Sequence, residues 1–204
     1  MIVQWSTNCG KECPGCFEEF GFLDMTHHRN GIIRPYTLKE AQLQPYDPLY
    51  PEVAANIIAL IKANAEGVSV EHVGSTAIGQ CEGKGIIDLM VLYTEGNLEK
   101  SKESLYSLGF QSQPHEDPFG QDRPMLVGSI QYAGRLYPIH VHVIRQDSEE
   151  AKEMIRFRHV LRRNSRLRES YIRCKRKILE IGTKNSAEYS KAKGSFVEQV
   201  LRTR

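Results

Sequence analysis

Apolar positions follow two periods along this chain, and the mixture predicts an α+β protein. In residues 51–64 they recur every three or four positions behind a proline, the pattern of an amphipathic helix. In residues 68–72 they alternate with polar residues, the pattern of a strand whose two faces differ. The same criteria predict strands over 86–93, 125–131 and 137–144, and helices over 97–108 and from Ser148, Ser165 and Ser186 onwards. We expect a mixed, largely antiparallel sheet with a C-terminal helical part over 147–204.

Two of the C-terminal helices carry apolar stripes that predict their buried faces. In the helix that begins near Ser165 the stripe is Leu167, Tyr171, Cys174, Ile178 and Ile181. In the helix that begins near Ser186 it is Phe196, Val197, Val200 and Leu201. These are expected core positions, so the helical part should pack as a cap on the rest of the domain.

The strand over 86–93 is the most apolar of all, and Asp88 is its one charged residue. With a period of two, Ile86, Asp88, Met90 and Leu92 share one face. An ionised carboxylate in a buried strand is costly unless it meets a cation. Asp88 is therefore a candidate metal ligand, and the alternative is an aspartate that caps a loop at the end of the strand.

A turn of small residues about a dozen positions earlier strengthens that interpretation. Glycine lets the backbone approach phosphate oxygens, and hydroxyl and amide groups donate hydrogen bonds to them. Mg²⁺ is commonly shared between one or two carboxylates and substrate phosphates. A small-residue turn before an acid on the next strand resembles the layout of a polymerase-beta-type nucleotidyltransferase site. Gly74, Ser75 and Thr76 are accordingly candidate phosphate-binding residues.

Two histidines in the strand over 137–144 are candidates to complete this site. His140 and His142 share a face, while Ile139, Val141 and Val143 point to the core. They could bind a metal with Asp88, contact a phosphate or act as general base. Imidazole suits zinc, manganese or iron better than magnesium. The alternative is a pair of half-buried histidines bonded to neighbouring loops.

Short segments along the chain resemble the GrpB (UPF0157) family, in the family's order. They are HVGSTAIGQCEGKGIIDLMV from residue 72, YDPLYP at 46–51, IHVHV at 139–143, FRHVLR at 157–162, YIRCK at 171–175 and YSKAK at 189–193. The resemblance covers about residues 43–203 and implies a nucleotidyltransferase-like fold over a domain of residues 41–204. A shared fold does not determine the reaction.

The chain departs from the family pattern at three positions. Gly79 and Gly85 stand where the family has prolines, which raises the cost of ordering the loop by up to about 1 kcal/mol each. Met90 stands where active members of the superfamily carry a second acid. A two-metal mechanism would then need ligands from elsewhere. Nucleotide binding is the primary expectation, and transfer depends on those ligands.

Basic residues supply further candidates. Lys84 lies between the turn and the acid, Arg123 lies in a polar loop, and Arg158 lies in a predicted helix at one of the family's basic positions. Guanidinium groups bind phosphate through two parallel hydrogen bonds, so both arginines are candidate phosphate contacts. Surface ion pairs are the alternative for each. Arg162 and Lys175 also resemble basic positions of the family and lie off the apolar stripes.

Charge is unevenly distributed over the chain. The formal net charge is +2, but residues 145–204 hold 17 Lys and Arg against 8 Asp and Glu, so the remainder is −7. A basic helical part beside an acidic half could attract a phosphorylated substrate, or it could be an ordinary solvated surface. No helix shows a known duplex-docking motif, so we do not expect direct recognition of a nucleic-acid duplex, although the basic helices leave a tRNA-like acceptor open.

Residues 1–40 are predicted to be an extension of the family domain, and they hold three of the five cysteines. Cys9, Cys13 and Cys16, completed by His27 or His28, could bind Zn²⁺ tetrahedrally. Their spacing also resembles the iron-sulfur loop of radical-SAM enzymes. Those enzymes need a large α/β barrel after the loop, and here the following residues belong to the GrpB-like domain. A third possibility is an arm with free thiols.

The remaining features predict a cytoplasmic protein. The sequence contains no run of 18 apolar residues, so we expect no membrane-spanning helix. The N-terminus lacks the basic and apolar regions of a secretory signal. The odd number of cysteines favours a reducing compartment. We expect binding of a nucleoside triphosphate with Mg²⁺ or Mn²⁺ and transfer of a nucleotidyl group to a small acceptor. The alternatives are a non-catalytic ligand-sensing or interaction module and a His/Asp metal-dependent enzyme of another class.

Overall fold

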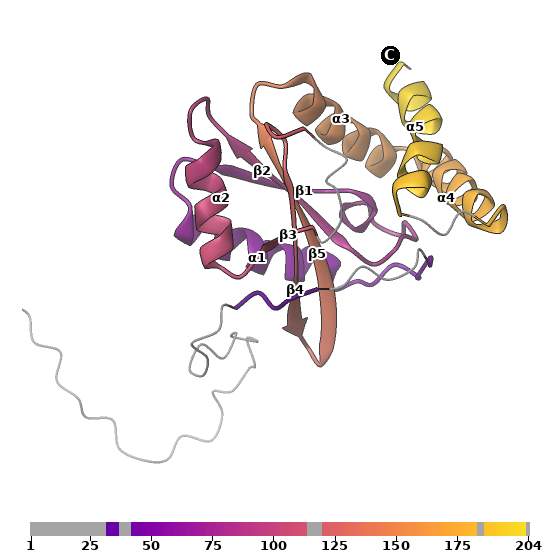
Figure 1. The fold of residues 1–204 in the computed structure, drawn as a ribbon. Helices are drawn as coiled ribbons and strands as arrows, with labels where there is room; N and C mark the ends of the chain where they lie inside the picture. The colour runs from indigo at the N-terminus through magenta and orange to yellow at the C-terminus, as the bar shows by residue number, and fades with distance from the viewer. Residues whose placement is uncertain (1–31, 37–41, 114–119, 183–185, 203–204) are drawn as a thin grey trace, which may run out of the picture.

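A computed structural model describes residues 32–36, 42–113, 120–182 and 186–202 (Figure 1). The elements, in chain order, are α1 (Tyr50–Asn64), β1 (Ser69–Val73), a 3₁₀ turn (Ser75–Ala77), β2 (Ile87–Tyr93), α2 (Leu98–Ser107), β3 (Gln111–Ser112), β4 (Met125–Tyr132), β5 (Arg135–Arg145), α3 (Glu149–Arg163), α4 (Ser165–Glu180) and α5 (Ser186–Arg202). The predicted helices and long strands are confirmed to within a few residues, and β3 was not predicted.

The strands form one mixed sheet in the order β1-β2-β5-β4-β3. β2 and β5 are parallel, and the other neighbours are antiparallel. The parallel pair lies at the centre, where Asp88 is opposite His140 and Met90 is opposite His142. Because paired residues project to the same side of a sheet, the acid and both histidines share one face.

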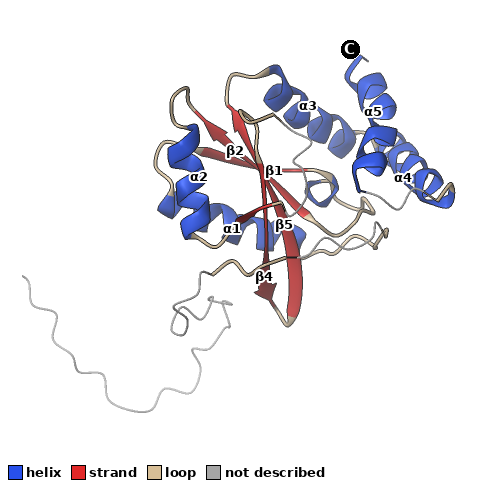
Figure 2. Ribbon diagram, in the orientation of Figure 1, coloured by secondary structure: helices blue, strands red, loops and turns tan. Residues whose placement is uncertain are grey.

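Helices cover both faces of the sheet (Figure 2). The main core lies between the sheet and α1 and α2, and it contains Leu89, Val91, Val141 and Val143. On the opposite face, Met90, Leu92 and Ile144 pack against Ala151, Met154 and Ile155 of α3. The alternation predicted for both central strands is therefore confirmed, and it places Asp88 on the side of the C-terminal helices.

The C-terminal helices are capped and packed as a unit. Ser148 caps α3 by accepting a hydrogen bond from the Ala151 amide at 3.2 Å, which matches the predicted helix start. The Tyr171 ring packs against Phe157 and Phe196, with ring centroids 5.3 and 5.4 Å apart. Together with Ile78, Cys81 and Leu161, these side chains join the helices to the loop that follows β1.

Two predictions for α4 were wrong. Ile181 is 75% exposed, because the helix ends at Glu180 before the apolar stripe is complete. Lys175, predicted to lie off the buried stripe, is 1% exposed beneath the loop over 81–85.

Among the described residues, no helix is both long enough and apolar enough to span a bilayer. The predicted zinc ligands Cys9, Cys13, Cys16 and His27, with the alternative His28, lie outside the described residues.

Candidate functional site

The two central strands bring the predicted catalytic residues together. His140 Nδ1 lies 3.6 Å from Asp88 Oδ1, and His142 Nε2 lies 3.8 Å from the same oxygen. Both imidazoles are buried, whereas the Asp88 side chain is 24% exposed. One carboxylate thus serves as the common neighbour of two imidazoles, with part of its surface open to a ligand.

The turn before β2 touches this carboxylate. Gly74 has φ +71° and ψ −171°, a conformation that is essentially restricted to glycine. A Cβ at this position would overlap Asp88 Oδ2 and lie 2.9 Å from Asp88 Cγ. Val73 pairs with Asp88 across the sheet, so the register of β1 and β2 fixes the contact. The predicted turn and the predicted acid are neighbours in space.

A hydrogen-bond chain holds the rest of the turn. Thr76 Oγ1 donates to the Ile86 carbonyl at 3.1 Å, so it accepts from His72 Nε2 at 3.0 Å. Burial lowers the pKa of His72 to about 4, although the Asp88 charge opposes this shift, so the ring is neutral at pH 7. Thr76 is 1% exposed, and its hydroxyl therefore supports the turn from inside.

Ser75 and Lys175 hold the loop that leads to β2. A Cβ on Gly83 would lie 3.0 Å from Ser75 Cβ and would overlap the hydroxyl, so Ser75 lies directly against the loop backbone. The Lys175 ammonium donates to the Glu82 carbonyl and lies 3.4 Å from Cys81 Sγ. Burial lowers the pKa of Lys175. The buried Lys175 thus holds the loop that leads to β2 through its contacts with Cys81 and Glu82.

Two further lysines flank one aromatic ring. Lys84 Nζ lies 5.3 Å and Lys193 Nζ 4.7 Å from the centroid of the buried Tyr189 ring. Burial, together with the charges of Lys84 and Lys175, lowers the pKa of Lys193 to about 8, and the charge of Asp88 opposes this shift. Several cations thus gather near a single carboxylate, and the local charge favours an anionic ligand. Lys193 was not predicted as a site residue, although it ends the YSKAK segment.

Asp88 and His140 have protonation states that suit cation binding. Burial alone would raise the pKa of Asp88, but contact with His142 and the charges of His140 and Lys193 outweigh it and lower the pKa. Burial lowers the pKa of His140 to about 4. His140 Nε2 is buried and makes no hydrogen bond to any residue that the structure describes. At pH 7 the site therefore offers a carboxylate beside a neutral imidazole.

The model of the GrpB protein family matches residues 40–203. The chain belongs to the GrpB family. It is 28% identical over 176 residues to a UPF0157 protein of Halalkalibacterium halodurans, which covers 84% of this chain and 86% of the relative. It is 29% identical over 164 residues to a UPF0157 protein of Pseudomonas aeruginosa, which covers 78% of this chain and 66% of the relative.

A solved structure of the family has the same fold. The GrpB protein of Enterococcus faecalis superposes with a TM-score of 0.63 and 23% identity, over 78% of this chain and 94% of that protein. A Cid1 poly(U) polymerase bound to MgATP superposes with a TM-score of 0.48 and 16% identity, over 74% of this chain and 50% of that protein. The predicted α+β fold class with a mixed sheet is confirmed.

The side chains of this GrpB-family site are close to the spacing that a metal ion requires. Two ligands about 2.1 Å from one ion lie about 3.4 Å apart at a tetrahedral ion and about 3.0 Å apart at an octahedral ion such as Mg²⁺. The Asp88–histidine separations of 3.6 and 3.8 Å exceed both spacings, and they are nearer the tetrahedral one. In the described parts of the chain, no three His, Cys, Asp or Glu residues are arranged as metal ligands.

Met90 leaves no second carboxylate on β2. Its side chain is fully buried with Val73, Leu92 and Ile144 in the apolar cluster beneath α3. The position two residues after Asp88 therefore belongs to the core.

The two predicted arginine contacts have protein partners. Arg158 is buried, and its guanidinium donates to Glu71 Oε2 at 2.7 Å and to the His72 carbonyl at 2.6 Å. Arg123 forms an ion pair with Glu150 at 2.5 Å. Arg158 ties α3 to β1, and Arg123 ties the segment before β4 to α3. Neither arginine is therefore assigned to a phosphate.

Proposed function

We propose that this GrpB-family protein binds a nucleoside triphosphate together with Mg²⁺ or Mn²⁺ and transfers a nucleotidyl group to a small acceptor. The observation that carries the proposal is the position of the Asp88 carboxylate. It lies against the Gly74 backbone and within 4 Å of both His140 and His142. The proposed metal ligand and the proposed phosphate-binding turn are therefore adjacent.

Each residue has a role that follows from its chemistry. Gly74 and Ser75 donate hydrogen bonds to the phosphates from the backbone and the hydroxyl group, and Lys84 and Lys193 supply positive charge. Asp88 binds the cation with one or both histidines, and the second imidazole can instead take the proton of the acceptor. The bound cation neutralises charge on the phosphates. Positioning and charge neutralisation supply the catalysis.

The surroundings support an anionic substrate in a reducing compartment. Residues 145–204 hold 17 Lys and Arg against 8 Asp and Glu, and this part forms the helices on the Asp88 side of the sheet. Such a potential concentrates a phosphorylated ligand near the site. The odd number of cysteines favours a reducing environment, so we place the activity in the cytoplasm.

Titration calorimetry with ATP, GTP, CTP and UTP in Mg²⁺ or Mn²⁺ tests this proposal. The wild type should bind at least one triphosphate only when the metal is present. Asp88→Asn should lose that binding by more than about tenfold, because it removes the anionic ligand while keeping the side-chain volume. Asp147→Asn is the matched control, since Asp147 is 70% exposed and pairs with Arg145. Equal affinity in wild type and Asp88→Asn would refute the proposed site.

The buried Met90 favours a second candidate, a binding module without transfer activity. A site with one carboxylate can hold a nucleotide and a single ion without the second ion of a two-metal mechanism. Release of pyrophosphate from a bound triphosphate, assayed with a mixture of small hydroxyl and amine acceptors, separates the two functions. Stoichiometric binding with no release above the Asp88→Asn background would favour the module.

The two histidines motivate a third candidate, a metal-dependent enzyme of another class. Two imidazoles and one carboxylate are a ligand set suited to iron or zinc. Elemental analysis of protein purified without chelator decides between this and a magnesium site. Stoichiometric iron or zinc that is lost in His140→Ala would favour the third candidate.

A further inference from the structure

The segment Ile33 to Tyr36 is joined to the edge of the sheet. The Arg34 amide donates to the Ser129 carbonyl at 2.8 Å, and the Ser129 amide donates to the Arg34 carbonyl at 2.9 Å. The Ser129 hydroxyl also lies 3.1 Å from the Pro35 carbonyl, to which it can donate. Three hydrogen bonds to one residue of β4 hold this short segment in a defined position.

Ile33 fixes the direction in which the segment faces. Its side chain is 2% exposed and lies in the core on the α1 and α2 side. It occupies the space that a Cβ on Gly128 would need, next to the Phe110 ring. In an extended segment, side chains alternate between two sides. With Ile33 in the core, Arg34 and Tyr36 belong to the opposite face, where Asp88 and His140 lie.

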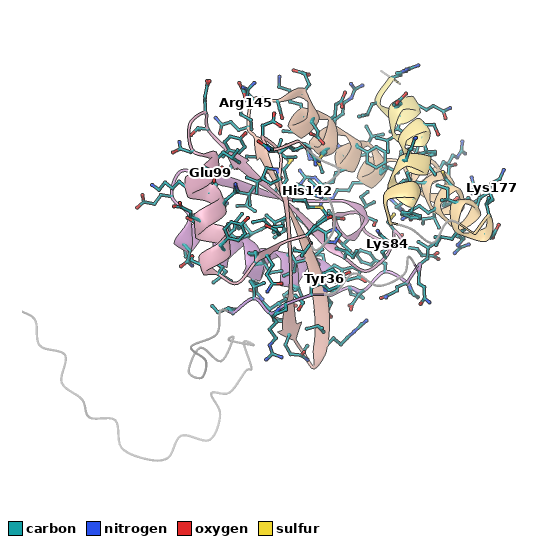
Figure 3. The ribbon with its side chains drawn as sticks, viewed as in Figure 1. Tyr36, Lys84, Glu99, His142, Arg145 and Lys177 are labelled. Carbon is teal, nitrogen blue, oxygen red and sulfur yellow. The ribbon has the colours of Figure 1, made fainter. Side chains whose placement is uncertain are left out.

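Tyr36 reaches the candidate site on that face. Its ring centroid lies 6.1 Å from that of His140, with 53° between the ring planes. His140 is in turn 3.6 Å from the Asp88 carboxylate. Figure 3 labels Tyr36, Lys84 and His142, which come from three different parts of the chain. Tyr36 is partly exposed.

This aromatic residue precedes the part of the chain that the family model matches, residues 40–203. It stands beside the residues proposed to bind a metal and phosphates. An aromatic ring at the border of such a site offers a flat surface to the planar end of a nucleotide. The phosphates and the base would then contact different parts of the chain.

We infer that Tyr36 is the platform on which the base of the bound nucleotide stacks, an inference that rests on the proposed function. Stacking on an aromatic side chain tolerates all bases, because every base has a π-face. Tyr36 should accordingly raise affinity for nucleotides in general and discriminate little between them. Its loss should weaken nucleotide binding roughly 5- to 150-fold and leave binding of the phosphates unchanged.

Paired titrations separate the base from the phosphates. ATP and inorganic tripolyphosphate, each with Mn²⁺, are titrated into wild type, Tyr36→Ala, Tyr36→Phe and Tyr106→Ala. Tyr106 is a 41% exposed tyrosine of α2 and serves as the matched control. We expect Tyr36→Ala to weaken ATP binding by the factor above with no change for tripolyphosphate. Tyr36→Phe and Tyr106→Ala should match the wild type.

The outcomes also distinguish this inference from the proposed function. If the wild type binds both probes and Tyr36→Ala binds ATP with unchanged affinity, the stacking role of Tyr36 is overturned and the proposed function is not. An equal loss for ATP and tripolyphosphate in Tyr36→Ala would also overturn it, because it would show that Tyr36 supports His140 structurally. Wild type that binds neither probe would overturn the proposed nucleotide site and the platform with it.

Discussion

Gly74 and Asp88 are in such close contact that the Asp88 carboxylate occupies the space where any other residue at position 74 would carry its Cβ. The Gly74 backbone has φ +71°, and the antiparallel register of β1 and β2 places it beside the acid. A turn suited to phosphate and a carboxylate suited to a cation are thus held together by the sheet itself.

Gly74→Ala should abolish metal-dependent nucleotide binding, because the new methyl group displaces the Asp88 carboxylate. It should also destabilise the fold by about 1–3 kcal/mol through its backbone conformation. Gly67→Ala is the control, since Gly67 also has φ +71° but a Cβ there would meet nothing within 4 Å. Urea unfolding and calorimetry on both variants measure the two effects. Nucleotide affinity lowered equally in both variants would contradict the role of the Gly74–Asp88 contact.

Lys193 should make phosphate binding sensitive to alkaline pH. Its pKa is lowered to about 8, so the free protein loses this charge as the pH rises above 8. A bound polyphosphate favours the charged form, so affinity for tripolyphosphate should fall between pH 8 and 10. Lys193→Arg should remain charged and show a flatter profile, measured by calorimetry at several pH values. The same profile in both proteins would show that Lys193 does not contact the phosphates.

His72 should make the fold sensitive to acid. Its pKa is lowered from 6.5 to about 4, so between these values the unfolded state binds more protons than the folded state. This group's contribution to the free energy of unfolding is therefore lost as the pH falls through that window, by up to about 3 kcal/mol. His72→Gln keeps an N–H donor for Thr76 but does not titrate, so it should lose less stability between pH 7 and 4. Urea unfolding of both proteins across this range provides the comparison, and parallel losses would contradict the assignment.

Arg158→Met should destabilise the protein by about 3–5 kcal/mol, because Glu71 and the His72 carbonyl lose a buried guanidinium. Arg156→Met, on the exposed side of the same helix, should change the free energy of unfolding by less than about 1 kcal/mol. Both variants should bind nucleotide normally at temperatures where they are folded. A selective loss of affinity in Arg158→Met would instead support a direct phosphate contact.

The elements of the fold follow from periodicity, whereas the packing of α4 does not. The alternation around Asp88 and His140 correctly predicts which residues share a face of the sheet. In α4 the same kind of argument places Ile181 inside and Lys175 off the buried face, but Ile181 is exposed and Lys175 is buried. Periodicity identifies the faces of a helix, but the length of the helix and the loop it covers decide which positions are buried. β3, with two exposed polar residues, carries no hydrophobic signal at all.

The residues of the candidate site also fall into those that the sequence predicts and those that it does not. His140 and His142 could be grouped from strand periodicity, and the family resemblance placed them with Asp88. Tyr36 and Lys193 were not predicted. Tyr36 reaches the site only because Ile33 fills the space beside Gly128, a contact between distant segments that leaves no local pattern along the chain. Lys193 lies four residues after Tyr189 on α5, and the YSKAK segment that contains both residues is the signal that could have identified it.

A crystal structure of the protein with Mn²⁺ and a non-hydrolysable ATP analogue tests the central claim most directly, through the anomalous scattering of manganese. We predict a single strong peak about 2.2 Å from an Asp88 oxygen and from one of the two imidazoles, with phosphate density at Gly74 and Ser75. The same experiment on Asp88→Asn should show neither feature. A manganese peak elsewhere, or nucleotide density with no ion at Asp88, would contradict the account.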